Sequence, residues 1–364
     1  MKYRISDRAS YLLFQQERGR AVFGVFPALY PKEILWAMGI VPAEIWDPPL
    51  ELQKVNAHLQ PYICSVVRSA MELVAQGKCD FLDGFLFPHT CDSIQNMASL
   101  INDYMGPEKP CYFFYHPKAP YTPASRRYYL NKLEELINSL EIQVGSFEQG
   151  RLEESIHLSN RVLSLIKRLY TERAEGRLAG SSKSFYELVR MGEFLMPEDF
   201  IPLLEQYLEQ NTLHESKRSL GVILSGILPN PLELLDIIEQ SGIRVVHDDL
   251  LNCSRRLLGP FIKTSPEPLE ALAEKYFRLP PCPTRGSGLQ ERIDFLVGLV
   301  KKTGAKGIIF NIVKFCEPEW FDLPNIQTQL KDLGIPILVL DTEINQGLSG
   351  QIITRVEAFL ELLT

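Results

Sequence analysis

The stretch Pro61-Tyr-Ile-Cys64-Ser-Val-Val-Arg68, together with Asp80-Phe-Leu-Asp-Gly-Phe-Leu-Phe-Pro-His-Thr-Cys91-Asp92, decides how the fold is interpreted. Residues 80–87 form a short apolar run that stops at a proline, which is typical of a buried strand in a parallel sheet. Cys91 then falls in the turn after this strand, and Asp92 is predicted to cap the helix that follows. Cys64 stands where a second helical pattern begins, over residues 62–76.

Both cysteines are therefore expected near the carboxyl edge of a sheet, where ligands of open α/β sheets collect. A thiol at a helix start is also expected to gain from the partial positive charge there, which favours the thiolate form that binds iron. The alternative is that Cys64 and Cys91 are ordinary buried cysteines, and their spacing alone leaves both interpretations open.

The composition describes a globular protein of about two domains. The chain has 364 residues, 45% of them apolar and 23% charged. A net charge of −7 argues against nucleic acid as the main partner, and no apolar run is long enough to cross a membrane. The N-terminal residues lack the apolar core of a signal peptide, so we expect a cytoplasmic protein.

The seven cysteines are odd in number, and no Cys-x-x-Cys pair occurs among them. With no export signal, free thiols or metal ligands are a better interpretation than a disulfide framework. Any metal site must gather cysteines that are far apart in the sequence.

Strand and helix patterns alternate over residues 1–120 and again over 216–364, which predicts two Rossmann-like α/β domains with parallel sheets. Between them, residues 121–215 carry only helical patterns and are interpreted as a helical connector packed against both sheets. Cys316 follows a predicted strand at 306–313, much as Cys91 follows a strand in the first domain. If the carboxyl edges of both sheets face one cleft, Cys64, Cys91 and Cys316 line it together. Three thiolates suit a cubane iron–sulfur cluster with one iron left open to substrate, water or sulfide.

At these residues the chain resembles the 2-hydroxyacyl-CoA dehydratase and benzoyl-CoA reductase family from end to end. It looks closest to the D-component (β-type) subunit of 2-hydroxyglutaryl-CoA dehydratase. The resemblance rests on six segments that occur in the right order, with the two cysteine segments at 62–68 and 87–92 counted as one. The other five are residues 30–42, 226–236, 247–250, 314–320 and 354–359.

The resemblance implies a [4Fe-4S] cluster between the two domains, with its three cluster cysteines carried over to Cys64, Cys91 and Cys316. It implies a homologous second subunit or a second copy of the chain, a separate iron–sulfur activator ATPase and an acyl-CoA substrate. One ATP-driven electron would then form a ketyl radical at the thioester, from which water is lost, as in an anaerobic lyase. No catalytic residue follows from the resemblance. This chain itself has no phosphate-binding loop with which to hydrolyse ATP.

Three rival functions stay open. The first is a benzoyl-CoA reductase subunit, which would be an oxidoreductase. The second is a small-molecule reductase with two linked cubanes, which needs six thiolates. The third is an electron-transfer or scaffold subunit whose partner holds the active site. In the second domain Leu251 stands where relatives often carry a cysteine, so Cys253 is a doubtful fourth ligand. Other candidates have structural alternatives: Arg68, Glu33, His89, Asp248 and Asp249.

Overall fold

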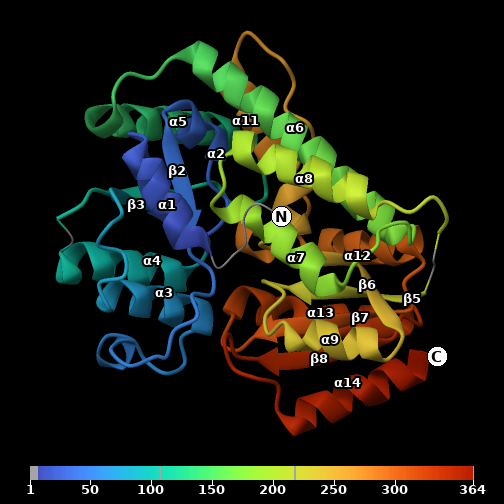
Figure 1. The fold of residues 1–364 in the computed structure, drawn as a ribbon. Helices are drawn as coiled ribbons and strands as arrows, with labels where there is room; N and C mark the ends of the chain where they lie inside the picture. Colours follow the sequence, from blue (N-terminus) through green and yellow to red (C-terminus); the bar gives the residue numbers. More distant parts are fainter. Residues whose placement is uncertain (1–6, 107, 217–218, 364) are drawn as a thin grey trace.

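The computed structural model describes residues 7–106, 108–216 and 219–363. It contains two four-stranded parallel sheets, with strand orders β2-β1-β3-β4 and β6-β5-β7-β8 (Figure 1). The predicted α/β class with two parallel sheets is therefore confirmed. The strands are β1 Ala21–Val25, β2 Ile40–Glu44, β3 Gly84–Pro88, β4 Cys111–Phe114, β5 Leu220–Gly226, β6 Ile243–Leu250, β7 Gly307–Val313 and β8 Ile337–Thr342.

Each sheet is buried on both faces, as expected for parallel sheets. Successive side chains of a strand point to opposite faces, and those of β1 and β3 divide between two separate apolar clusters. Strands β5 and β7 divide in the same way, and one of their clusters is shared with the first sheet. The apolar runs seen in the sequence therefore exist because neither face meets water.

Helices cover these faces and connect the two sheets. The long helix α6 packs against α2 beside the first sheet and against β6 of the second, and Figure 1 shows it running along both. Helix α11 also packs against α5, although the two are far apart in the sequence. The α-helices are α1 Arg8–Glu17, α2 Lys32–Ala37, α3 Ser65–Ala75, α4 Asp92–Ser99, α5 Pro123–Val144, α6 Gln149–Ala174, α7 Ser182–Arg190, α8 Pro197–Asn211, α9 Glu233–Gln240, α10 Ser254–Leu257, α11 Pro268–Phe277, α12 Leu289–Thr303, α13 Glu317–Asp332 and α14 Gly350–Leu363.

Two features near the cysteines follow from local sequence. Helix α13 begins at Glu317 and continues through Pro324. Pro318 lies in the first turn of α13, where a missing N–H costs no helical hydrogen bond. The strand expected from residue 80 starts at Gly84, because residues 80–82 form a turn stabilised by hydrogen bonds from Asp80 and Leu82 to Gly77 and Cys79. The start of α13 at Glu317 places Cys316 at the beginning of a helix.

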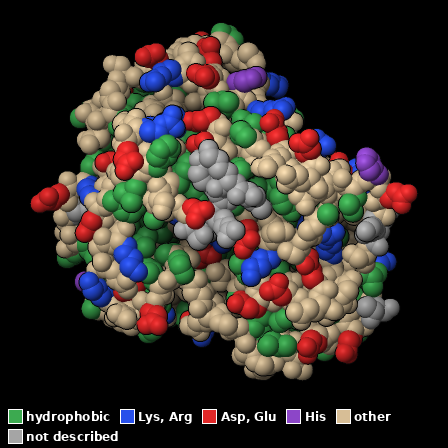
Figure 2. Space-filling view, in the orientation of Figure 1, with side chains coloured by type: hydrophobic (Ala, Val, Ile, Leu, Met, Phe, Trp, Pro, Cys, Tyr) green, Lys and Arg blue, Asp and Glu red, His purple; other side chains and the backbone are tan. Residues whose placement is uncertain are grey.

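The surface shows no broad area of one charge on the face drawn in Figure 2, where acidic and basic side chains are interspersed. Within the described residues, no helix combines the length and apolar character needed to cross a membrane.

Candidate functional site

Cys64, Cys91 and Cys316 line one pocket, which we call the cysteine pocket. Pro27 follows β1 there, Ile227 follows β5 and Val313 ends β7, so the pocket lies where strands of both sheets end. The remaining lining residues are Trp46, Val66, Val67, Thr90, Ile94, Leu251, Thr284 and Pro318. The structure thus brings together the three cysteines that the sequence singled out, from three distant points of the chain.

Each of the three cysteines is the N-cap residue of a helix of eight or more residues: Cys64 for α3, Cys91 for α4 and Cys316 for α13. Asp92 was predicted as the cap of α4, but that prediction was wrong by one residue, because Cys91 already has the extended backbone of a cap. The first N–H groups of a helix are unpaired within it, so these helix starts point donors toward the thiols.

The backbone beside the pocket adopts an unusual conformation. Ala28 and Leu29 follow Pro27 with φ values of 73° and 60°, and Phe315 precedes Cys316 with φ of 63°. Residues with a side chain avoid this left-handed region unless their surroundings hold them there. The hydroxyl of Thr90 donates to the carbonyl of Pro27 at 2.8 Å and fixes one of these turns. Strained backbone therefore borders the pocket on both sides.

The three thiols are hard to ionise as they stand. Burial raises the pKa of Cys64 to about 12, and the neighbouring Cys91 adds to the effect. Burial likewise raises the pKa of Cys91 and places that of Cys316 well above its usual value. Backbone N–H groups lower the thiol pKa values only in part. The helix starts therefore favour thiolate as expected, but desolvation raises the pKa values by more than the helix starts lower them. Ionisation of these thiols would therefore require a further positive charge beside them, such as a bound cation.

Lys118 joins the two halves of the molecule next to Cys91. Its ammonium donates to the carbonyls of His89 and Thr90 at 3.0 and 3.1 Å, and to the carbonyl of Thr284 from the second half. Burial lowers the pKa of Lys118, and Cys91 and Cys282 raise it in part. The ammonium is thus a fixed positive charge close to the cysteine pocket.

A buried carboxylate supports Trp46 on another wall of the pocket. The indole of Trp46 donates to Glu44 at 2.9 Å, and Glu44 also accepts from Tyr30 at 2.8 Å. Lys32 and Arg256 pair with the same carboxylate at 2.7 and 2.8 Å. Burial by itself would raise the pKa of Glu44, but Arg256 and Lys32 bring it down to about 2. Glu44 therefore stays charged and holds Trp46 in place.

A second buried network anchors α13, the helix that Cys316 begins. Arg255 donates two hydrogen bonds of 2.8 and 3.0 Å to the carboxylate of Asp249 and also forms an ion pair with Glu319. Glu319 lies in the first turn of α13 and receives a further bond of 3.1 Å from Arg292. Since Arg255 and Glu319 are both almost completely buried, the network fixes the position of the helix start.

The other sequence candidates lie outside the cysteine pocket and have structural partners. Arg68 donates to Asn56, Glu33 pairs with Lys275, and His89 faces Asp92 at 3.5 Å. Asp248 accepts from the backbone N–H groups of Leu250 and Ser254 and from the hydroxyls of Tyr170 and Tyr186. The four remaining cysteines also lie elsewhere: Cys79, Cys111, Cys253 and Cys282. Six thiolates are therefore not gathered at this pocket.

Three cysteine thiols are a donor set of the kind that holds iron–sulfur clusters. Thiolates on one zinc-like ion stand within roughly 4 Å of each other, given metal–sulfur bonds of about 2.3 Å. Among the described residues, no three His, Cys, Asp or Glu side chains meet closely enough to hold one metal ion. Three thiols that line one pocket can each bind a different iron of one cluster.

Sequence reasoning missed the residues that surround the thiols. Lys118, Glu44 and Arg255 reach the site through tertiary contacts that have no local sequence signal. Glu319 had a weak signal, because it lies within the segment 314–320 that contains Cys316.

Comparison with known proteins agrees with the resemblance. The family described as "2-hydroxyglutaryl-CoA dehydratase, D-component" matches residues 27–363. Similar proteins include lactoyl-CoA dehydratase subunit beta of Anaerotignum propionicum, 25% identical with 96% of this chain and 94% of that protein covered. A benzoyl-CoA reductase subunit of Thauera aromatica is 28% identical, with 92% and 88% covered. (R)-2-hydroxyglutaryl-CoA dehydratase subunit beta of Acidaminococcus fermentans is 22% identical, with 95% and 93% covered. The chain therefore belongs to the family of the 2-hydroxyglutaryl-CoA dehydratase D-component, a family of enzyme subunits.

Proposed function

We propose that this chain is the β-type subunit of a 2-hydroxyacyl-CoA dehydratase-type enzyme and binds a [4Fe-4S] cluster through Cys64, Cys91 and Cys316. One observation carries the proposal: these three cysteines, from both halves of the chain, line a single pocket where the strands of both sheets end. With three protein thiolates, the fourth iron of a cubane is left open.

The chain's own residues have defined tasks around such a cluster. Backbone N–H groups of Val66 and Val67 point at Cys64, and those of Ser93 and Ile94 point at Cys91. These donors favour the thiolate forms once iron is present. The ammonium of Lys118 offsets negative charge near Cys91.

The apolar side chains of the pocket exclude water, which strengthens electrostatic interactions inside and protects reactive intermediates from side reactions. When bound, the cluster would supply the low-potential electron that activates an acyl-CoA thioester for loss of water. The organic chemistry then belongs to cluster and substrate, while the protein orients and shields them.

The partners follow from the family. Relatives named as beta subunits imply a second subunit in their assemblies. We infer that this chain pairs with a homologous subunit, or with a second copy of itself, and takes its electron from a separate iron–sulfur activator ATPase. The substrate class is a 2-hydroxyacyl-CoA.

Iron analysis tests the cluster first. The chain is purified without oxygen, and iron and acid-labile sulfide are measured for the unchanged protein and for Cys64→Ser, Cys91→Ser and Cys316→Ser. About four irons and four sulfides per chain are expected in the unchanged protein, with a large loss in each variant. Cys79→Ser is the matched control, because Cys79 is comparably buried but lies outside the pocket. About eight irons would point to a linked pair of cubanes, and equal iron in all variants would refute the ligand assignment.

Activity then tests the enzyme. The chain is assayed alone, with its partner subunit, and with partner plus activator and ATP, for loss of water from 2-hydroxyacyl-CoA thioesters. We expect activity only in the complete mixture and expect Cys316→Ser to abolish it. Unchanged activity with Cys316→Ser would support a scaffold role in which the partner's site is sufficient.

One rival function has specific support, since the relative from Thauera aromatica is named as part of a benzoyl-CoA reductase. The same complete mixture is therefore offered benzoyl-CoA. Reduction of the aromatic ring, without loss of water from any 2-hydroxyacyl-CoA, would assign the chain to the reductases.

A further inference from the structure

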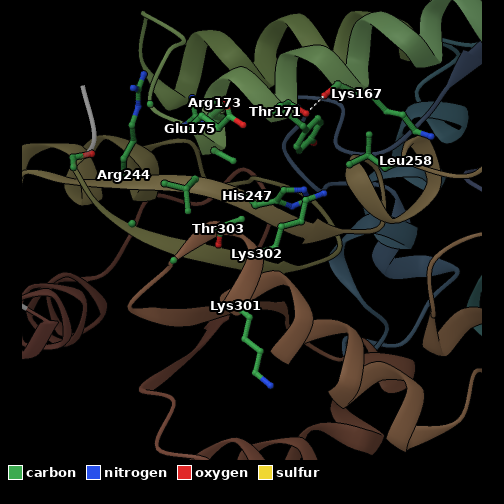
Figure 3. A pocket seen from close by; sticks show the side chains of 17 residues that line it. Lys167, Thr171, Arg173, Glu175, Arg244, His247, Leu258, Lys301, Lys302 and Thr303 are labelled. Atoms are coloured by element: carbon green, nitrogen blue, oxygen red, sulfur yellow. Dashed lines mark hydrogen bonds between the residues drawn. The ribbon is translucent and has the colours of Figure 1, made fainter. Parts of the chain in front are cut away.

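A second cavity, of about 850 Å³, lies beside β6, the edge strand of the second sheet. We call it the β6 pocket. Its walls come from β6, from the C-terminal half of α6 and from the end of α12 (Figure 3). The charged and ionisable side chains most important for the argument are Lys167, Arg173, Arg244, His247 and Lys302.

The β6 pocket is separate from the cysteine pocket. Gly221 and Arg244 line it near the beginnings of β5 and β6, whereas Ile227 and Leu251 line the cysteine pocket just after those strands end. A strand of this length spans about 20 Å. A ligand in the β6 pocket would therefore lie near the amino ends of the strands, whereas the three cysteines lie near their carboxyl ends.

The charge of the β6 pocket is positive and unbalanced. Five lining residues are lysine or arginine, although the whole chain has a net charge of −7. Glu175 is the one acidic residue in its lining, and it is already paired with Arg177. Within the described part of the chain, none of the five lining cations forms an ion pair.

Arg173 is the most informative of these cations, because it is only 1% exposed. Its Nε donates to the carbonyl of Val245 at 2.6 Å and its Nη2 donates to Ser182, but its Nη1 has no partner in the structure. The guanidinium lies over the ring of Phe185 at 4.5 Å, and the nearby carboxylate of Glu239 bonds to Ser182 rather than to Arg173 itself. A buried guanidinium with no directly paired carboxylate and an unused donor is costly. The charge of Arg173, in the wall of the pocket and without a paired carboxylate, favours an anion in the pocket beside it.

A second pair of positive side chains, Lys167 on α6 and Lys302 on α12, lies beside His247 of β6. Burial lowers the pKa of Lys167, and the nearby charge of Lys302 lowers it further. Burial also lowers the pKa of His247, and Lys302 again adds to the effect. Figure 3 shows the side chain of Lys302 beside the ring of His247, while that of Lys301 points away from the others. The two positive groups, Arg173 with Arg244 and Lys167 with Lys302, thus lie in one cavity.

We propose that the β6 pocket binds a small molecule that carries two or more phosphate groups. Two separated positive groups match a ligand with more than one anionic group, and arginine and lysine are the usual phosphate partners. The cavity is within the size range of pockets for small molecules, and Leu258 adds an apolar wall to it. This site is distinct from the proposed cluster site, because it lies near the amino ends of the strands and the cysteines lie near their carboxyl ends.

Titration calorimetry on the full chain tests the proposal with pyrophosphate, ADP and citrate as probes. We expect saturable binding of pyrophosphate or ADP that weakens as salt is added. Lys302→Ala and Lys167→Ala should each weaken it about tenfold, the usual loss for one charge-assisted hydrogen bond. Lys301→Ala removes the same charge from the neighbouring position and should change binding by less than about twofold, because its side chain points away.

The three probes and the three variants distinguish the possible outcomes. Tighter binding of ADP than of pyrophosphate identifies a nucleotide site, and the reverse identifies a site for the diphosphate itself. Citrate binding as tight as that of both phosphate probes would overturn the phosphate assignment. Absence of saturable binding, or an equal loss in Lys301→Ala, would overturn the site. Circular dichroism and iron content should remain unchanged in all three variants, which distinguishes failure of this proposal from failure of the cluster.

Discussion

Replacement of Arg255 by methionine is expected to destabilise the folded chain by about 3–5 kcal/mol. Arg255 is 2% exposed and joins Asp249 on β6 to Glu319 on α13. Methionine has a similar length but no charge, so the substitution removes the pairing without opening a large cavity. The change should therefore report on the ion pair rather than on packing.

The magnitude depends mainly on what happens to Asp249. After the substitution, Glu319 still accepts a hydrogen bond of 3.1 Å from the charged Arg292. Asp249 is left with a hydrogen bond of 2.9 Å from the neutral hydroxyl of Ser225 and has no charged partner. A buried carboxylate left with a neutral donor costs several kcal/mol. The double variant Arg255→Met/Asp249→Asn removes that uncompensated charge, so we expect it to regain about half of the loss.

Urea unfolding at pH 7, with stability extrapolated to water, measures the effect. The matched control is Arg278→Met, because Arg278 is 56% exposed and lies 3.5 Å from Glu274. An exposed pair of this kind contributes about 0–1 kcal/mol. A loss below about 1 kcal/mol for Arg255→Met, or no recovery in the double variant, would refute the reasoning that this buried network positions α13.

The remaining predictions concern Glu44 and Lys118. The pKa of Glu44 is about 2, below its usual value of 4.5, so its contribution to stability is complete above about pH 4.5 and is lost as the pH falls toward 2. Glu44→Gln should lower stability at pH 7 by about 3 kcal/mol and flatten the acid side of the stability curve, measured as urea midpoints from about pH 3 to 7. Lys118→Met should cost about 2–3 kcal/mol and speed amide hydrogen exchange near Thr284, because charged hydrogen bonds between the halves are lost. Lys109→Met, which removes bonds only to the carbonyls of Cys79 and Asp80, should leave exchange near Thr284 unchanged, and an equal effect of both variants would contradict the bridging role.

The sheets and the grouping of the cysteines could be predicted from the sequence for a physical reason. Strands buried on both faces read as continuous apolar runs, so β5 and β7 are visible without any tertiary knowledge. A cysteine directly after such a strand must lie at the carboxyl edge. Cys91 and Cys316 could therefore be placed at equivalent edges of two similar sheets. The limits of the three predicted segments remain a prediction, since α6 and α11 pack across them.

The surroundings of the thiols could not be predicted, because they depend on contacts between distant segments. Lys118 meets Thr284 across the two halves, and Arg256 reaches Glu44 from the second half to the first. The net pKa values of the thiols could not be predicted for the same reason. A helix start is visible in the sequence, whereas the burial that raises the pKa of Cys64 appears only after folding.

The central claim is that Cys64, Cys91 and Cys316 bind one cluster together, and X-ray absorption at the iron edge of the anaerobically purified chain tests it most directly. We predict iron ligated by sulfur with scattering from neighbouring iron atoms in the unchanged protein, and loss of the iron–iron signal in Cys316→Ser. Iron bound mainly by oxygen or nitrogen, or an iron–iron signal that survives the loss of the Cys316 thiol unchanged, would contradict this claim.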